Sequence, residues 1–197
     1  MDTMSVNQHV FDSFPEIKTG RLLLRQIQLE DAVEIMKMRQ NKQVNQFIAR
    51  GSMSDVEEAE LLVEKTIQAF ESKSGIGWAG VLRDRFEIIG TCGFNKIDYL
   101  NNRAEIGGEL SVDFWGKHLA IEAVQAIVAF GFREMNLHTI EAIVSPQNRG
   151  AVFLLEHLGF EKEAHFKERI FFNDSYLDMA VYTLFRSQFE EKGNPVD

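Results

Sequence analysis

The sequence predicts one domain of the α/β (α+β) class. Segments whose apolar residues alternate with polar ones, as in strands, are interspersed with segments whose apolar residues recur every three or four positions, as in helices. Their predicted order is β-α-α-β-β-β-α-β-α-β-β, without a repeat, a low-complexity segment or an internal linker. A chain of 197 residues is long enough to bury a substantial core in a single domain.

The first strand and the first two helices follow from local patterns. Residues 21–27, RLLLRQI, alternate as a strand does. Residues 29–41 carry apolar side chains at helical spacing, with acidic residues in the first turn, where the helix dipole favours them. A longer helix is predicted over residues 54–73, because Ser54 and Glu57 form a capping-box pattern at its start.

Three strands are predicted next, over residues 77–83, 86–97 and 103–112. The turns between them are short and polar, so we expect an antiparallel meander. The last of these strands contains Gly107 and Gly108. Glycines weaken a strand and often mark a bulge or a close approach of the backbone.

The stretch from Glu109 to Phe132 changes from strand spacing to helix spacing at Gly116. Where a strand ends at a helix N-terminus, unpaired backbone N–H groups meet the positive end of the helix dipole, and phosphates bind there. Gly116 would let a phosphate approach. The alternative is an ordinary turn in which Gly116 only relieves crowding. The residues that would supply the N–H groups are Lys117, His118, Leu119, Ala120 and Ile121.

The remaining elements alternate in the same way. A strand is predicted over Thr139–Ser145, and a helix over residues 148–159 that stops at Gly159, the residue expected at a left-handed helix cap. Two long strands, residues 160–172 and 175–185, are predicted to form a hairpin around an Asn-Asp-Ser turn.

These elements divide the chain into three parts. Residues 1–20 are expected to be a loosely ordered N-terminal lead-in, residues 21–186 the folded domain, and residues 187–197 a polar C-terminal tail.

Composition limits the classes of function. Hydrophobic residues make up 45% and charged residues 26%, as in an ordinary globular protein. The net charge of -9 argues against nucleic-acid binding and is compatible with a cationic or amine-bearing partner. Cys92 is a lone cysteine in an apolar setting, interpreted as a buried small side chain and not as a nucleophile. No signal-peptide pattern and no apolar run of membrane-spanning length occurs, so a cytoplasmic protein without a membrane partner is expected.

Five segments in fixed order resemble the GNAT N-acetyltransferases. They are RLLLRQIQLEDA, IIGTCGFNKID followed by NNRAEIG, DFWGKHLAIEAVQAIVAFGF, SPQNRGAVFLLEHLGF and YLDMAVYTL. The resemblance covers Arg21 to Phe185 and is closest to the Rim-type branch, which includes ribosomal-protein N-terminal acetyltransferases. It implies a mixed, mostly antiparallel central sheet, splayed at the cofactor site, with helices on both faces. It also implies acetyl-CoA as cosubstrate. No His, Cys, Asp or Glu cluster has metal-ligand spacing, so no metal is expected.

The resemblance also implies roles for particular residues. The family's phosphate-binding signature falls on residues 113–118, with two departures, Asp113 and His118. The preceding strand should pair its backbone with the pantetheine arm of the cosubstrate, and one of its N–H groups should polarise the thioester carbonyl. Beside the arm the family has an asparagine, and an aromatic residue lies on the helix that follows. The residues at these positions are Leu110, Ser111 and Val112 on the strand, and Asn148 and Phe153 beyond it.

Two carboxylates are candidates for the general base. Period-two alternation places Glu105 and Glu109 on the same face of their strand. The first matches a glutamate common in the Rim-type branch, and the second stands where that branch often has an aromatic residue. For each, the alternative is a solvated or salt-bridged carboxylate.

The expected acid for the leaving thiolate is missing. Leu155 and Ala151 stand where the family places a tyrosine or a serine. Tyr176 and His157 are substitutes, although the first is equally interpreted as a packing residue and the second as a helix-surface residue. Solvent is the remaining source of the proton. A thiol with a pKa of about 8.5 can leave as a thiolate, so no dedicated acid is required.

The leading hypothesis is an acetyl-CoA-dependent N-acetyltransferase whose acceptor is a protein N-terminal amine, attacked directly in a ternary complex. A small-molecule amine (a polyamine, an amino-acid derivative or an antibiotic) is the first alternative. A non-catalytic acyl-CoA-binding module and a purely structural domain are the others. The sequence leaves open whether the protein forms a homodimer.

Overall fold

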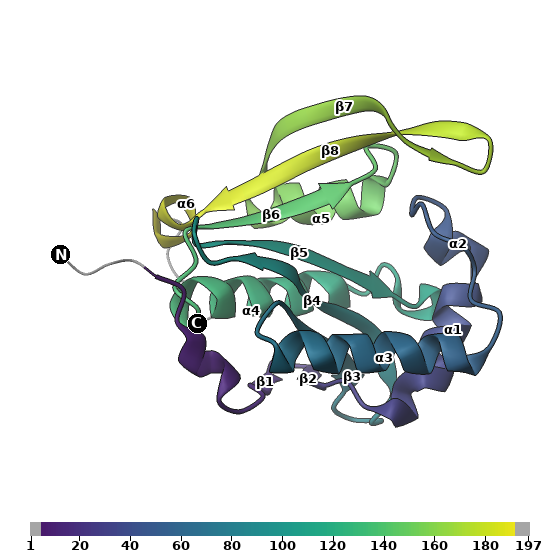
Figure 1. The fold of residues 1–197 in the computed structure, drawn as a ribbon, viewed down its shortest axis with the longest axis horizontal. Coiled ribbons are helices and arrows are strands. Elements are labelled where there is room, and N and C mark those ends of the chain that lie inside the picture. The colour runs from purple at the N-terminus through teal and green to yellow at the C-terminus, as the bar shows by residue number, and fades with distance from the viewer. Residues whose placement is uncertain (1–4, 192–197) are drawn as a thin grey trace.

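The computed structural model describes residues 5–191 (Figure 1). The strands are β1 (Ile17–Lys18), β2 (Leu22–Gln26), β3 (Ile76–Leu82), β4 (Ile88–Asp98), β5 (Arg103–Leu110), β6 (Thr139–Val144), β7 (Glu161–Phe172) and β8 (Ser175–Phe185). The α-helices are α1 (Ala32–Gln40), α2 (Lys42–Asn45), α3 (Val56–Glu71), α4 (Leu119–Arg133), α5 (Arg149–Leu158) and α6 (Arg186–Glu191). Three short 3-10 turns are η1 (Gln8–Phe11), η2 (Leu29–Asp31) and η3 (Val112–Phe114).

The strands form one eight-stranded sheet in the order β1-β2-β3-β4-β5-β6-β8-β7. All neighbours are antiparallel except β5 and β6, which are parallel. The predicted α/β (α+β) class, the mixed and mostly antiparallel sheet and the β3-β4-β5 meander are therefore confirmed. Beyond the end of β6, the β7–β8 hairpin continues alone (Figure 1).

Helices cover both faces of the sheet, as predicted, and β3 shows why. Trp78 points to one face, where its ring lies 5.4 Å from Phe130 of α4. Its neighbour Ala79 points to the other face and packs with Ala59 and Val63 of α3. Both Trp78 and Ala79 are fully buried, because β3 lies inside the sheet with a helix on either side.

The lead-in is more ordered than expected. Residues 1–4 lie outside the described part, but β1 pairs with β2, and Val6 and Phe11 are buried in the main core. The Trp78 indole donates a hydrogen bond of 2.7 Å to the carbonyl of Pro15. Apolar residues spaced too irregularly to signal an element therefore still anchor this segment to the domain.

The C-terminal tail is also partly structured. Residues 186–191 form α6, whereas residues 192–197 lie outside the described part. The Phe189 ring lies 5.0 Å from that of Phe132, and Arg186 donates to the carbonyl of Leu137. One aromatic side chain thus holds a segment that its polar composition had marked as a tail. The three-part division of the chain stays a prediction.

The cap of α3 is shifted by one residue from the predicted pattern. Asp55, and not Ser54, is the N-cap, and its side chain accepts a hydrogen bond of 3.0 Å from the N–H of Glu58. In return, the Glu58 carboxylate accepts from the N–H of Ser54. The predicted capping box is therefore replaced by a related arrangement in which Asp55 caps the helix and Glu58 binds the residue before the cap.

Candidate active site

The sheet opens between its two parallel strands. The β5–β6 pairing covers only three residue pairs, from Arg103–Thr139 to Glu105–Glu141. Beyond them β5 stays paired with β4 as far as Leu110, while β6 stays paired with β8. Figure 1 shows β5 and β6 diverging in this direction. The splayed sheet that the resemblance implied is confirmed.

The register shows which backbone groups face this opening. Ser111 donates its N–H to the carbonyl of Ile89 on β4, at 2.8 Å. Because backbone groups alternate between the two sides of a strand, the N–H groups of Gly108 and Leu110 point away from β4, toward the opening. We call these two residues the open edge of β5. The N–H of Leu110 is therefore available for the predicted pairing with the pantetheine arm, whereas the N–H of Ser111 is bonded within the sheet. Gly108 offers a second available N–H. It was not among the predicted pairing residues, although the two glycines had indicated a close backbone approach in this strand.

The predicted strand is longer than the observed one at this end. Val112 belongs to η3 and not to β5. The turn is closed by hydrogen bonds from Phe114 to Ser111 and from Trp115 to Val112, at 3.0 and 3.2 Å. The Trp115 indole also donates to the Leu110 carbonyl at 3.0 Å, so this carbonyl is already satisfied.

The strand-to-helix junction contains two residues in a left-handed backbone conformation, which occurs in anion-binding turns. Gly116 and His118 both have left-handed φ angles, +71° and +60°. Left-handed residues in such a turn orient successive N–H groups toward one side. The N-terminus of α4 has no side-chain cap, and its first helical hydrogen bond runs from Glu122 to His118. The N–H groups of Leu119, Ala120 and Ile121 thus have no partner among residues 5–191.

The histidine in the signature has a conformational cost. Position 118 needs a positive φ, which glycine adopts freely and which costs other residues about 1–2 kcal/mol. Histidine is among the side chains that adopt it more readily than most. The departure at His118 therefore leaves the backbone geometry of the junction in place.

Two residues of the N-terminal segment, Thr19 and Arg21, hold this junction in place. Arg21 donates to the Lys117 carbonyl at 2.9 Å and to the Glu122 carboxylate at 2.7 Å, and Thr19 donates to the same carboxylate at 2.6 Å. Burial acts to raise the pKa of Glu122, yet the hydrogen bonds from Thr19 and Arg21 together hold it below its usual value. The sequence alone gave no sign of these contacts, because Arg21 and Glu122 are far apart in the chain.

Across the opening, Asn148 caps α5. Its side-chain oxygen accepts a hydrogen bond of 3.1 Å from the N–H of Ala151, and its amide NH₂ has no partner within residues 5–191. Because β5 and β6 are parallel, Asn148, which follows β6, lies at the same end of the sheet as Leu110. Phe153 is exposed on α5, and its ring stacks on that of His157 at 5.7 Å.

Glu105 lies where β5 and β6 stop pairing. It is half-buried, and no hydrogen bond or ion pair within residues 5–191 involves its carboxylate. Lys96 stands opposite it across β4–β5, next to an irregularity in β4 that leaves Asn95 unpaired. A carboxylate without a partner at the mouth of the opening is placed to accept a proton.

Glu109 lies on the same face but in a different environment. Its side chain is 3% exposed, and Arg39 donates to one carboxylate oxygen at 2.7 Å. The other oxygen forms an ion pair with Arg50. This geometry favours the salt-bridged interpretation of Glu109, since both oxygens are engaged. Neither arginine was a candidate from sequence, because both lie more than 50 positions away along the chain.

Neither position 155 nor Tyr176 presents a hydroxyl group at the opening. Leu155 is buried in the core, so this position has no room for a tyrosine without repacking. Tyr176 is 63% exposed near the tip of the β7–β8 hairpin, where its ring contacts Phe171 at 5.0 Å. It lies four residues before Ala180, the last β8 residue paired with β6, which is about 14 Å along an extended strand.

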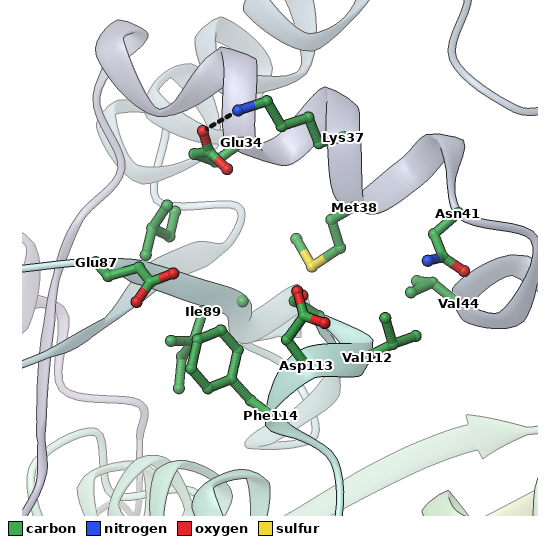
Figure 2. Close-up of a pocket in the computed structure, with 13 residues that line it drawn as sticks. Glu34, Lys37, Met38, Asn41, Val44, Glu87, Ile89, Val112, Asp113 and Phe114 are labelled. Atoms are coloured by element: carbon green, nitrogen blue, oxygen red, sulfur yellow. Dashed lines mark hydrogen bonds and ion pairs between the residues drawn. The ribbon is translucent and has the colours of Figure 1, made fainter.

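A small pocket lies under α1, at the end of β5. Its volume is about 160 Å³, below the roughly 300–1,000 Å³ of typical ligand sites. Figure 2 shows the Asp113 carboxylate and the Met38 thioether in this pocket and the Glu34–Lys37 ion pair above it. With Glu87, three carboxylates face one ammonium group. Such a pocket disfavours phosphates, so the junction, and not this pocket, suits a phosphate-bearing ligand.

The remaining candidates have ordinary environments. Cys92 packs against the main core, and burial raises the pKa of its thiol to about 12, so it is no nucleophile at neutral pH. Within residues 5–191 no group of three or more His, Cys, Asp or Glu side chains is placed to hold a metal ion. No helix in this part of the chain is long and apolar enough to cross a membrane.

An opened sheet edge, an uncapped helix N-terminus and an unpaired carboxylate are features that fit a group-transfer enzyme with a phosphate-bearing donor. Comparison with known proteins gives the family. Residues 21–161 match the acetyltransferase (GNAT) domain, and the chain belongs to this family of N-acetyltransferases.

Among curated relatives, the uncharacterized N-acetyltransferase p20 of Bacillus licheniformis is 33% identical over 87% of this chain and 96% of its own. A candidate ribosomal N-acetyltransferase of Bacillus subtilis, YdaF, is 24% identical over 96% of this chain and 98% of its own. The spermidine N(1)-acetyltransferase of Vibrio cholerae is 25% identical over 86% and 96%.

Solved structures agree on the fold. A GNAT-family acetyltransferase from Bacillus anthracis has a TM-score of 0.79 and 26% identity, covering 88% of this chain and 99% of its own. RimL, a ribosomal L7/L12 α-N-protein acetyltransferase solved with coenzyme A, has a TM-score of 0.81 at 19% identity, with the same coverage.

Proposed function

We propose that the protein transfers the acetyl group of acetyl-CoA to a primary amine, and that its acceptor is a protein N-terminal α-amine. The observation that carries this proposal is the open edge of β5 beside the uncapped N-terminus of α4. The edge offers strand-like hydrogen bonds to the pantetheine arm, and the helix end offers N–H groups to the pyrophosphate. Both features fit coenzyme A, which also occupies the RimL structure.

The residues then have distinct roles in the reaction. Glu105 accepts the proton of the acceptor amine, directly or through a water molecule. The neutral amine nitrogen forms a bond to the carbonyl carbon, which an N–H group of the open edge polarises. The bond from this carbon to sulfur breaks, and the thiolate takes a proton from solvent. Leucine at position 155 has no proton to donate, and Tyr176 is exposed near the hairpin tip.

The preference for an α-amine follows from its basicity. An unperturbed α-amino group has a pKa near 7.7–8.0 and a lysine side chain near 10.4, so far more of the α-amine is neutral at pH 7. A small polycation is the second candidate, because one relative is a spermidine acetyltransferase and the pocket under α1 is rich in carboxylates.

Steady-state turnover with acetyl-CoA and a panel of acceptors tests the proposal. The panel contains peptides with free or blocked N-termini and small amines such as spermidine. Acetylation of the free peptides alone is the expected result. Turnover only with small amines would show that the acceptor is a small-molecule amine. Tight coenzyme A binding without turnover on any amine would show that the protein is a non-catalytic binding module.

The phosphate site can be tested by calorimetry with coenzyme A. Gly116→Val should weaken binding by more than about tenfold, because a β-branched side chain at a φ of +71° is strained by about 1–3 kcal/mol and displaces the turn. Lys117→Ala is the matched control and should change Kd by less than about threefold, since the ammonium group lies over the Phe114 ring at 5.0 Å and phosphate binding rests on backbone donors. Normal binding by Gly116→Val would remove the junction as the pyrophosphate site.

The source of the thiolate's proton can be tested with Tyr176→Phe. If solvent protonates the thiolate, kcat should change by less than about threefold, because only an exposed hydroxyl at the hairpin tip is lost. A loss near about 10²-fold is what removal of a general acid produces. Such a loss, measured with saturating substrates, would assign the acid to Tyr176.

A further inference from the structure

The ion cluster of Arg39, Arg50 and Glu109 has an excess of positive charge. Two guanidinium groups face one carboxylate, whose side chain is 3% exposed, while the arginine side chains are 21% and 20% exposed. Buried and half-buried charges in proteins are normally balanced by partners. Here the two arginines share a single carboxylate, so the cluster has a net charge of one positive unit that no other described residue balances.

The two guanidinium groups are held rigidly. Arg39 donates its Nε to Glu109, whereas Arg50 donates its Nε to Asn45 at 2.8 Å and directs one terminal nitrogen at Glu109. Neither terminal nitrogen of Arg39, nor Nη1 of Arg50, has a partner within residues 5–191. These nitrogens are therefore donors in a fixed position, and a planar guanidinium fork binds carboxylates well.

The cluster is also under electrostatic repulsion. Burial lowers the pKa of Arg50, and the positive charge of Arg39 lowers it further, against the opposing attraction of Glu109. A second anion bound between the arginines would relieve this repulsion. A polycation in the same place would add to it.

The cluster lies on the face that carries the proposed base. Glu105 and Glu109 point to the same side of β5, about 14 Å apart along the strand, and the Asn95 amide packs over Gly107 between them. An extended peptide advances about 3.4 Å per residue. The distance of about 14 Å corresponds to about four such steps, so a peptide with its α-amine at Glu105 would bring the side chain of its fourth or fifth residue near the two arginines.

We propose that Arg39 and Arg50 form an anion-binding subsite that selects acceptors with a carboxylate, so that the preferred substrates are N-termini with an acidic fourth or fifth residue. This inference rests on the proposed function. It also separates the two candidate acceptors, because spermidine carries only positive charge.

The test uses peptides that differ at one position, with Glu, Gln or Lys as the fourth or fifth residue. The wild-type protein should show kcat/KM for Glu about tenfold or more above Gln, the range of one charge-assisted pair, with Lys lowest. Arg50→Gln and Arg39→Gln should each bring the Glu-to-Gln ratio near one, with kcat for the Gln peptide and the Kd for coenzyme A nearly unchanged. Arg50→Lys should keep part of the preference.

Arg85→Gln is the matched control, since it removes the same charge from an exposed turn far from the cluster in sequence, and it should keep the full preference. Each single substitution in the cluster leaves Glu109 paired with one arginine, so the variants should fold, which circular dichroism checks. Equal rates for Glu and Gln peptides in the wild-type protein, or a preference that persists in both arginine variants, would overturn the inference and leave the proposed function standing.

If no peptide is acetylated, the proposed acceptor is wrong, and the same ratio is measured on small primary amines with a carboxylate or its methyl ester. A carboxylate preference that depends on the arginines would support the subsite with a small acceptor. Equal rates would overturn it, and the absence of turnover with every amine would overturn both proposals.

Discussion

Replacing Glu105 by glutamine should lower kcat/KM for acetyl transfer by about 10²–10⁴-fold at neutral pH, the usual loss for a general base. Glutamine has nearly the same shape but cannot take a proton from the amine. Because the Glu105 carboxylate has no partner among the described residues, the substitution should leave stability and coenzyme A binding nearly unchanged.

The control for this prediction is Glu163→Gln, which removes a carboxylate from the exposed face of β7 and should keep full activity. The pH dependence of kcat/KM is the second measurement. If the acidic limb of the profile were unchanged in Glu105→Gln, another group would be the base, and the role of Glu105 would be limited to the sheet.

For Glu109→Gln, by contrast, the expected loss is in stability. The substitution leaves two guanidinium groups facing each other without their carboxylate, and breaking a buried ion pair in this way costs about 3–5 kcal/mol. In a domain of this size the Tm should fall by about 6–20 °C. Thermal unfolding followed by circular dichroism measures it.

The matched control is Glu34→Gln, which breaks the Glu34–Lys37 ion pair of α1, with side chains 51% and 60% exposed. Exposed ion pairs contribute about 0–1 kcal/mol to the free energy of unfolding, so the Tm of this variant should stay close to that of the wild-type protein. A Glu109→Gln protein with wild-type Tm but a collapse of kcat would reverse the assignments and make Glu109 the base.

The fold was largely predictable because its signals are local. The alternation in residues 21–27, the helical spacing in residues 29–41 and the glycine that ends α5 each depend on neighbours within a few positions. The two ends of the chain were predicted less well. There, single side chains such as Phe11 and Phe189 hold short elements through contacts with distant parts of the core.

The features of the candidate site were likewise predictable where their signals are local and not where they depend on distant residues. The junction at Gly116 could be found from sequence, because a glycine at a change of period is a local pattern. The different environments of Glu105 and Glu109 could not, since they are set by Arg39 and Arg50 from other elements. Likewise, the direction of the Ser111 N–H depends on the register with β4, and spacing along one strand does not fix register.

The two halves of the sheet share one core under α4, but β5 and β6 join them by only three residue pairs, so whatever fills the opening adds a further connection between them. Strands β1–β5 and β6, β8 and β7 share few hydrogen bonds directly. A ligand that lies along the open edge of β5 takes the place of a strand between β5 and β6. Its binding free energy then stabilises the contact between the two halves of the sheet. At about 100 times its Kd such a ligand stabilises the folded state by about 2.7 kcal/mol. A donor bound along this edge is therefore expected to stiffen the line between β5 and β6, which hydrogen exchange with and without coenzyme A would measure.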